Sequence, residues 1–309
     1  MRLILAPMEG LADESMRDLL TRLGGFDLCV AEFLRVTHHL LTEKFVLRTV
    51  PELANGGRTR AGVPVRVQLL GSDPVCLAEN AAHIAGLGAP GIDLNFGCPA
   101  PMVNRHGGGA ALLVEPERIH AIVAAVRRAV PQSVPVTAKM RLGLENTELT
   151  LDCARAVEAG GASELTVHAR TGADRYRPPA RWEWLARIRE EVKLPLVANG
   201  DVWTPQDWER IRRVSGCADV MTGRGAITRP DLARRIKTGA TAMTWPELLP
   251  WVVDFYALLR ARMDLRHAPG RLKQWLGMLG SAYPEAETLH RALRVERDPD
   301  AVEKMLEGR

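Results

Sequence analysis

The sequence lacks the features that mark membrane and secreted proteins. No stretch approaches eighteen apolar residues, so we expect no membrane span. The apolar run that follows Met1 is too short for a signal peptide and is broken by Pro7. We therefore expect a cytoplasmic protein.

Cysteines are also few, and their arrangement excludes common cysteine chemistry. The five are odd in number and scattered along the chain: Cys29, Cys76, Cys98, Cys153 and Cys217. No Cys-x-x-Cys pair and no Cys/His ligand spacing joins them. This pattern predicts reduced thiols and no zinc or iron–sulfur site, so we expect no bound metal.

Charge of either sign is in little excess, with a formal net charge of +4 and a pI of about 8.9. The 309 residues, 46% hydrophobic and 25% charged, are ordinary for a globular protein with a sizeable core. Four arginines gather between residues 170 and 181, and residues 260–294 hold seven Lys/Arg against three Asp/Glu. Either cluster alone is typical of a solvated face, whereas both together indicate a polyanionic partner.

Short apolar runs alternate with amphipathic segments over most of the chain. The runs lie at Leu3–Ala6, Leu28–Ala31, Val65–Leu70, Gly91–Leu94, Val136–Met140, Leu165–His168, Leu196–Ala198 and Asp219–Met221. Nearly continuous apolar runs are typical of parallel strands that are buried on both faces. The amphipathic segments include Asp13–Leu23, Pro116–Val130, Leu149–Ala159 and Pro205–Val214. This alternation predicts an α/β fold, a (β/α)8 TIM barrel over residues 1–242.

An open doubly wound sheet is the alternative, but the first strand–helix turn, Pro7 to Gly10, lacks the Gly-x-Gly-x-x-Gly pattern. The pattern changes near residue 243, and no strand candidate follows. Apolar residues recur at helical spacing in 251–259 and 272–279. We expect an all-helical carboxyl-terminal domain over residues 243–309.

One cysteine lies where α/β enzymes keep their chemistry. Cys98 follows the run that ends at Leu94, between Gly97 and Pro99, and the glycines 107–109 come soon after. The carboxyl ends of barrel strands carry catalytic groups, so this thiol is a candidate. A buried loop cysteine is the plain alternative.

Other strand ends carry polar residues that suit a bound anion and a ring with hydrogen-bond acceptors. Lys139 and His168 lie on neighbouring predicted strands, so their side chains can converge, although a satisfied core histidine is the alternative for His168. Glycine turns at 199–201 and 222–225 follow the last two strands. Such turns allow backbone N–H groups to approach a phosphate, and Arg224 adds a charged donor.

Together these segments resemble the tRNA-dihydrouridine synthases. The matching pieces run in order along the chain: Ala6–Glu9, Val67–Leu69, Asp93–Pro99, Gly107–Ala110, Lys139–Gly143, Val167–Thr171, Ala198–Asp201 and Gly223–Gly225. Glu32–Val36 and Arg271–Leu276 are most similar to the bacterial C subgroup, which modifies the uridine at position 16 of the tRNA D-loop.

This resemblance implies an FMN-dependent barrel with a helical tRNA-binding domain. In the family, NADPH reduces the flavin, which passes a hydride to C6 of uracil, and a cysteine matching Cys98 protonates C5. The residues expected to contact FMN are Pro7, Met8, Glu9, Gln68, Lys139, His168, Asn199, Gly200, Asp201, Gly223 and Arg224. Those expected to contact the base or the tRNA are Arg35, Asn95, Arg141, Arg271, Lys273 and Arg294.

The chain departs from the family at Pro101, where many relatives carry a lysine, so a contact to cofactor or RNA is absent. No dinucleotide-binding motif is present, and the preference for NADPH rests on the resemblance. A small-molecule flavin oxidoreductase of the dihydroorotate dehydrogenase type and a non-catalytic RNA-binding protein are the competing functions. We expect a monomer.

Overall fold

A computed structural model describes residues 1–307, and its strands form one parallel, nine-stranded sheet. The strands are β1 (Leu3–Leu5), β2 (Leu28–Val30), β3 (Leu34–Arg35), β4 (Val65–Leu70), β5 (Ile92–Phe96), β6 (Val136–Arg141), β7 (Glu164–His168), β8 (Leu196–Asn199) and β9 (Asp219–Thr222). β2 pairs with both β1 and β4, so the sheet closes, and β3 pairs with β4 alone beyond the end of β2. The predicted (β/α)8 barrel is confirmed.

Strand β5 differs most from its predicted range. It begins one residue later, at Ile92, and continues through Asn95 to Phe96. Asn95 pairs in register with Lys139 of β6, so both polar residues lie within the ladder near the carboxyl end of the barrel. The apolar pattern could not reveal this extension, because the barrel places polar side chains at this end. β3 was not predicted, because two residues are too few to show the hydrophobic pattern of a strand.

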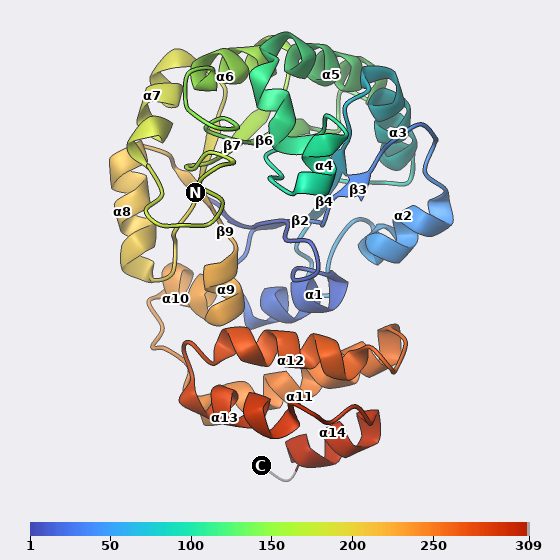
Figure 1. Ribbon diagram of the computed structural model, residues 1–309, viewed down its shortest axis with the longest axis vertical. Coiled ribbons are helices and arrows are strands. Elements are labelled where there is room, and N and C mark those ends of the chain that lie inside the picture. Colours follow the sequence, from blue (N-terminus) through green and yellow to red (C-terminus); the bar gives the residue numbers. More distant parts are fainter. Residues whose placement is uncertain (308–309) are drawn as a thin grey trace.

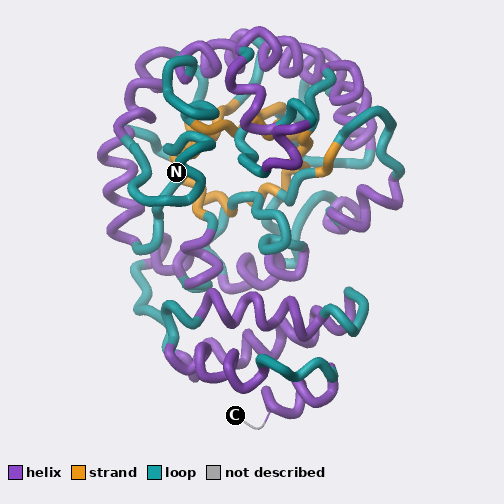
Figure 2. Tube along the Cα trace, viewed as in Figure 1, coloured by secondary structure: helices purple, strands orange, loops and turns teal. Residues whose placement is uncertain are grey.

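Helices surround the strands on all sides of the barrel (Figures 1 and 2). They are α1 (Glu14–Leu23), α2 (Glu43–Thr49), α3 (Pro74–Gly86), α4 (Pro101–Arg105), α5 (Pro116–Ala129), α6 (Thr150–Ala159), α7 (Glu183–Glu191), α8 (Pro205–Ser215), α9 (Arg224–Thr228) and α10 (Leu232–Thr238). Two 3-10 helices join them, η1 (Pro51–Asn55) and η2 (Gly109–Val114). Local sequence starts several of these helices: Asp13 caps α1, and Thr204 with Asp207 forms a capping box on α8.

The predicted helical region is present as four helices at one end of the molecule (Figure 1). They are α11 (Trp245–Arg262), α12 (Ala268–Leu279), α13 (Pro284–Leu293) and α14 (Pro299–Glu307). Trp275 of α12 is fully buried and donates from Nε1 to the carbonyl of Ile227 in α9, at 3.0 Å. One apolar cluster includes residues of both the barrel and these helices, so the two parts share a continuous core. The proposed boundary at residue 243 precedes α11 by two positions.

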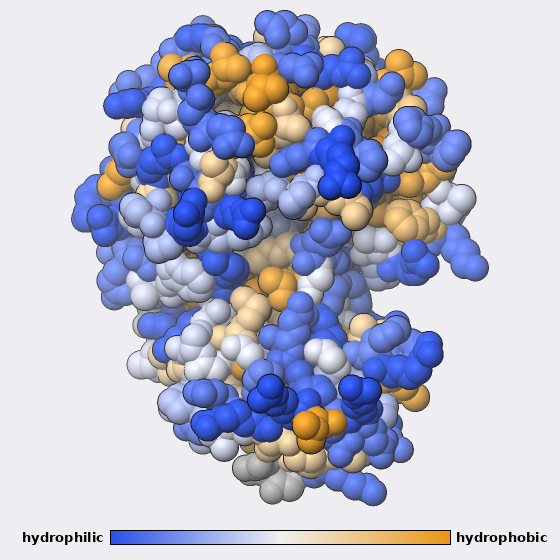
Figure 3. Space-filling view, viewed as in Figure 1, coloured by the Kyte–Doolittle hydropathy of each residue, from blue (hydrophilic) through white to orange (hydrophobic). Residues whose placement is uncertain are grey.

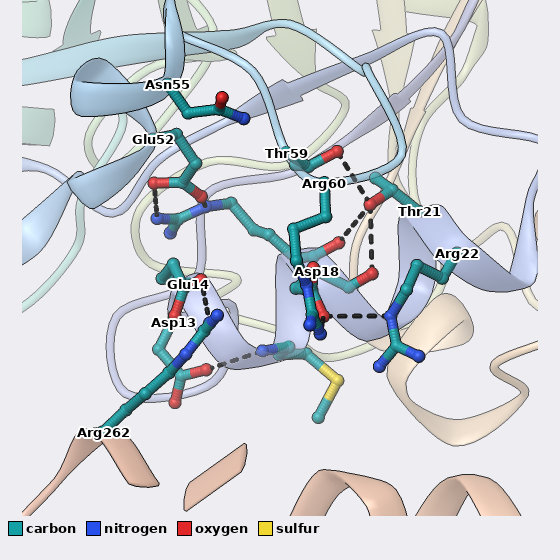
Figure 4. Close-up of polar contacts among 12 residues, drawn as sticks. Asp13, Glu14, Asp18, Thr21, Arg22, Glu52, Asn55, Thr59, Arg60 and Arg262 are labelled. Carbon is teal, nitrogen blue, oxygen red and sulfur yellow. Dashed lines mark hydrogen bonds and ion pairs between the residues drawn. The ribbon is translucent and has the colours of Figure 1, made fainter.

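Charged side chains lie between the barrel and the carboxyl-terminal helices, around α1 (Figure 4). Asp18 pairs with both Arg22 and Arg60, at 3.0 and 2.5 Å, and Arg262 of α11 pairs with Glu14. Glu14, Asp18, Arg60 and Arg262 line a groove of about 850 Å³ between α1, α2, η1 and α11. Figure 3 shows the outline indented between the barrel and the carboxyl-terminal helices, with mostly hydrophilic residues on this face.

Within residues 1–307, no helix combines the length and the apolar character that crossing a membrane requires.

We expect Glu52→Gln to lower the free energy of unfolding by about 3 kcal/mol, because it leaves the Arg17 charge buried without its partner. Arg17 is 0% exposed and donates two hydrogen bonds to the Glu52 carboxylate, at 2.7 and 2.9 Å. Urea unfolding followed by circular dichroism measures the change. The control is Asp152→Asn, which breaks an exposed pair with Arg155 and should leave unfolding close to that of the wild type. Equal losses in the two variants would contradict the assignment.

Candidate functional site

The carboxyl ends of the strands open into one cavity of about 570 Å³. Residues from the loops after β1, β5, β7, β8 and β9 line it, together with side chains from β4 and β6. Parallel strands in a closed barrel bring all of these ends to the same rim. Residues that are far apart in the sequence therefore share one space.

The Cys98 thiol lies at this rim on a loop that is fixed by hydrogen bonds. The Asn95 side-chain oxygen accepts from the backbone N–H groups of Gly97 and Cys98, both at 2.9 Å. The Cys98 carbonyl accepts from the Ala110 N–H at 3.0 Å. Gly109 has φ +60°, and a Cβ there would lie 2.7 Å from the Cys98 carbonyl oxygen, so a side chain would push the loop away. Burial raises the pKa of Cys98, which keeps the thiol protonated at neutral pH.

A series of hydrogen bonds between buried polar side chains fixes the orientation of Asn95. Asn95 donates to the Gln68 oxygen at 2.8 Å, and Gln68 donates to the Asp93 carboxylate at 2.6 Å. The Thr137 hydroxyl donates to the other Asp93 oxygen at 2.5 Å. Each amide orientation is therefore set by its neighbour, so Asp93 fixes Gln68, and Gln68 fixes Asn95. One N–H of Gln68 and one of Asn95 remain for a ligand.

Lys139 projects from β6 into the cavity as a donor without a partner. Its side chain makes no hydrogen bond or ion pair with any residue in the described range 1–307. Burial, followed by the positive charge of Arg141, lowers the pKa of Lys139 to about 8. This amine can donate to a carbonyl oxygen or ring nitrogen of a ligand.

His168 is held neutral with a defined tautomer. Burial, followed by the charges of Arg141 and Lys139, holds the pKa of His168 well below its ordinary value. Its Nε2 lies 3.1 Å from Nη1 of Arg170, which can only donate, so Nε2 accepts and the ring proton is on Nδ1.

The expected basic cluster of residues 170–181 does not include Arg170, because this side chain is buried. Its side chain is 0% exposed and pairs with Asp201 at 2.5 Å. Asp201 also accepts from the Ala180 N–H at 2.7 Å. Burial alone would raise the pKa of Asp201, but the Arg170 guanidinium and the Ala180 N–H lower it. Arg170 thus supports His168 and Asp201 from inside the protein.

Four residues form a cation–aromatic stack at the mouth of the cavity. The Arg141 and Arg224 guanidinium carbons lie 5.3 and 4.8 Å from the centre of the Tyr176 ring. Arg224 also lies 5.3 Å from the Trp203 ring centre. Tyr176 remains 53% exposed, so part of this side chain is open to an incoming ligand. Neither aromatic residue was expected in the site; the one sequence signal for Tyr176 is its position between two arginines, Arg175 and Arg177.

Arg141 connects the two loops that border the cavity. It donates to the Gly97 carbonyl next to the thiol, and to the carbonyls of Thr171 and Arg175, each at 2.8 Å. The side chain is 2% exposed, and burial lowers its pKa. The guanidinium also faces the Tyr176 side chain at the edge of the cavity.

The turns after β8 and β9 pack too closely for a side chain at two of their glycines. A Cβ on Gly225 would lie 2.0 Å from the Val202 carbonyl oxygen, and one on Gly200 would lie 3.2 Å from the His168 ring. Arg224 lines the cavity beside them and makes no ion pair within residues 1–307. Free cationic donors and side-chain-free turns at one end, with Lys139 and Gln68 at the other, fit a phosphorylated planar ring such as a flavin nucleotide.

A family model described as dihydrouridine synthase matches residues 4–269 of this chain. Curated relatives match it almost end to end. A tRNA-dihydrouridine(16) synthase of Aquipseudomonas alcaligenes is 56% identical over 99% of this chain and 99% of its own length. One from Pseudomonas syringae pv. tomato is 55% identical, over 99% and 98%. This chain belongs to the dihydrouridine synthase family.

Solved structures that resemble this synthase support the barrel alone. An old yellow enzyme homologue from Zymomonas mobilis has a TM-score of 0.57 and 14% identity, covering 78% of this chain and 90% of its own. A 2-naphthoyl-CoA reductase complex has a TM-score of 0.59 and 13% identity, covering 77% of this chain and 50% of its own. Both share the barrel fold with this chain, and at such low identity they support no conclusion about its function.

The cavity of this synthase brings together most of the expected site residues. Lining it are Pro7, Met8, Glu9, Gln68, Asn95, Cys98, Lys139, Arg141, His168, Asn199, Gly200, Asp201, Gly223 and Arg224. Four expected tRNA contacts lie elsewhere: Arg35, Arg271, Lys273 and Arg294. Of these, Arg294 is exposed, whereas Arg271 is only 9% exposed. Residues 1–307 contain no group of three His, Cys, Asp or Glu side chains that suits a metal ion.

We expect the Lys139 amine to gain half of its full reactivity near pH 8 in the flavin-free protein, well below an ordinary lysine near pH 10.4. As the pH falls below 8 the amine becomes protonated and its acylation slows. Pulse labelling with an amine-reactive ester across a pH series, read by peptide mass spectrometry, gives the profile. Lys193 is exposed and serves as the internal reference. A Lys139 profile that superimposes on that of Lys193 would refute the lowered pKa.

Proposed function

We propose that this synthase uses FMN and NADPH to reduce the C5–C6 double bond of the uridine at position 16 of the tRNA D-loop to 5,6-dihydrouridine. The similarity to tRNA-dihydrouridine(16) synthases over nearly the whole chain supports the substrate. One observation carries the chemistry: a protonated thiol and several free cationic donors face the same cavity.

The residues that would hold FMN divide between its two ends. Gly200, Gly223 and Arg224 suit the phosphate, because they offer close backbone approach and an unpaired guanidinium. Lys139 and Gln68 suit the acceptor atoms of the ring, because both carry N–H donors that face the cavity. The other residues proposed to contact FMN line the same cavity: Pro7, Met8, Glu9, His168, Asn199 and Asp201. When bound, FMN that NADPH has reduced supplies the hydride that arrives at C6 of the uracil.

Cys98 is the proposed proton donor. As the C5–C6 double bond is consumed, the Cys98 Sγ–H bond breaks and its proton goes to C5, leaving a thiolate that regains a proton from solvent. The raised pKa suits this role, because the acid must be protonated before each reaction. The hydrogen-bonded loop holds the sulfur at the rim, which lowers the entropic cost of orienting the thiol toward C5.

The target base must leave its stack to enter the cavity, which costs least in a loosely structured loop. Arg141 and Asn95 are the proposed contacts to the uracil edge, because both line the cavity and Asn95 retains one N–H that internal bonds leave free. The exposed Tyr176 ring offers a face on which the extruded base or its neighbour can stack.

We further propose that residues 243–309 form the tRNA-binding domain and that the protein acts as a monomer. Arg35, Lys273 and Arg294 are proposed contacts to the tRNA. Lys273 has Nζ 2.7 Å from the Glu296 carbonyl, so it borders the turn that carries the exposed Arg294. Such phosphate contacts predict tRNA binding that weakens with salt.

A small-molecule flavin oxidoreductase of the dihydroorotate dehydrogenase type is the competing function. The similarity to the tRNA-dihydrouridine(16) synthases extends through the four carboxyl-terminal helices. A small substrate needs no such region. Tight, salt-sensitive binding of tRNA separates the two functions.

We expect purified wild-type protein to bind FMN and, with NADPH, to form dihydrouridine at position 16 of tRNA taken from a strain deleted for this gene. Cys98→Ala should retain FMN and tRNA binding but lose activity by about a hundredfold or more, because it removes the proton donor. Mass-spectrometric mapping of the tRNA measures the product.

Cys76→Ala is the matched control, because this partly exposed thiol lies on α3, away from the cavity. It should react as the wild type does. Full turnover by Cys98→Ala would reject the assigned donor, and a wild-type protein that binds neither FMN nor tRNA would reject the proposed function.

A further inference from the structure

We propose that Arg271 of α12 is a positioning residue for the cofactor loop, so that the carboxyl-terminal helices help to build the flavin site itself. The inference rests on the proposed FMN site. It assigns Arg271 to the β1–α1 loop, whereas the family resemblance suggests a contact with tRNA.

The β1–α1 loop runs from the cavity to the helical region. Its first residues, Pro7 to Glu9, line the cavity, as does Leu11. Its last residue, Asp13, caps α1 by accepting from the Met16 N–H at 2.9 Å. Any movement of residues 10–13 therefore moves the side chains that border the flavin site.

Arg271 reaches this loop from α12 with two charge-assisted or polar hydrogen bonds. Its Nε donates to Oδ2 of Asp13 at 2.7 Å, and its Nη2 donates to the Leu11 carbonyl at 2.6 Å. The guanidinium carbon lies 5.1 Å from the centre of the Phe255 ring of α11. Only 9% of the residue is exposed, so little of its guanidinium faces a partner outside the protein.

The barrel provides a second support for the same loop. Arg17 donates to the Ala12 carbonyl at 2.8 Å, and the Glu32 carboxylate accepts from the Gly10 N–H. These two contacts and the two from Arg271 hold four consecutive residues, Gly10 to Asp13. Arg271 is the member of this set that comes from the carboxyl-terminal helices, so it couples them to the loop.

Two substitutions remove this contact while preserving the fold. Arg271→Met keeps an apolar stem against Phe255 and also removes Nη1, which is buried without a partner among the described residues. Asp13→Asn keeps a side-chain oxygen to cap α1, since Asn is as good a cap as Asp. Both leave the cavity lining unchanged in sequence.

The experiment measures FMN affinity by fluorescence titration of the flavin-free full chain, without tRNA. We expect each variant to raise the Kd for FMN by about tenfold, which corresponds to about 1.4 kcal/mol. The double variant should bind as Arg271→Met does, because the change at Asp13 has no further effect once its Arg271 partner is gone. Thermal unfolding followed by circular dichroism verifies that each variant is folded.

An exposed pair on the same region provides the matched control. Arg266 pairs with Asp264 at 2.6 Å, with side chains 81% and 44% exposed. Arg266→Met and Asp264→Asn repeat the two chemical changes away from the loop and should leave the Kd within twofold.

An unchanged FMN affinity in Arg271→Met would overturn the inference, whether or not its tRNA affinity falls. Additive losses in the double variant would also overturn it. If the wild type itself binds no FMN, the proposed function fails instead, so the two failures are distinguishable.

Discussion

The hydrogen bonds from Asn95 to the backbone of Gly97 and Cys98 are the constraint on which the site depends. They fix a thiol at the rim of the barrel, and they exist because Gln68 and Asp93 hold the Asn95 amide in one orientation. This support begins in the register of three neighbouring strands, β4, β5 and β6. The closed barrel thus determines the position of the proposed acid through a short series of buried polar contacts, each of which satisfies a group that would be costly to leave unpaired.

The same cavity also has an excess of positive charge. Lys139 and Arg141 approach it from β6, Arg170 from the loop after β7, and Arg224 from the start of α9. Burial of Lys139 and of His168, followed by the positive charge of their neighbours, lowers the pKa of both groups. Only Arg170 has a carboxylate partner among residues 1–307, which is Asp201. The remaining cations are therefore available to an anion and to electron-rich acceptor atoms. A bound phosphate and an acceptor ring would offset this excess of positive charge and the desolvation that accompanies it.

Much of this arrangement could be predicted from the sequence, for physical reasons that differ between residues. Continuous apolar runs predicted the strands, and polar residues at their ends predicted Cys98, Lys139 and His168 as neighbours. The burial of a loop side chain could not be predicted, so Arg170 was included in a basic cluster that indicated a polyanionic partner, although it is enclosed. The role of Asp93 depends on cross-strand register, which no single segment encodes. Tyr176 lies in a loop, where side-chain direction depends on contacts with Arg141 and Arg224.

The carboxyl-terminal helices illustrate why composition alone is a weak guide to the role of a charge. Their basic excess indicated a nucleic-acid surface, yet Arg262 pairs with Glu14 and Arg271 pairs with Asp13, so both guanidinium groups are committed to the barrel. The continuous apolar core and the buried Trp275 bond to α9 strengthen this attachment. Arg260, Arg266 and Arg291 also form ion pairs, so fewer basic residues remain for a polyanion. The same helices therefore serve two purposes, because the face packed against the barrel orders the first loop while the outer face stays charged and exposed.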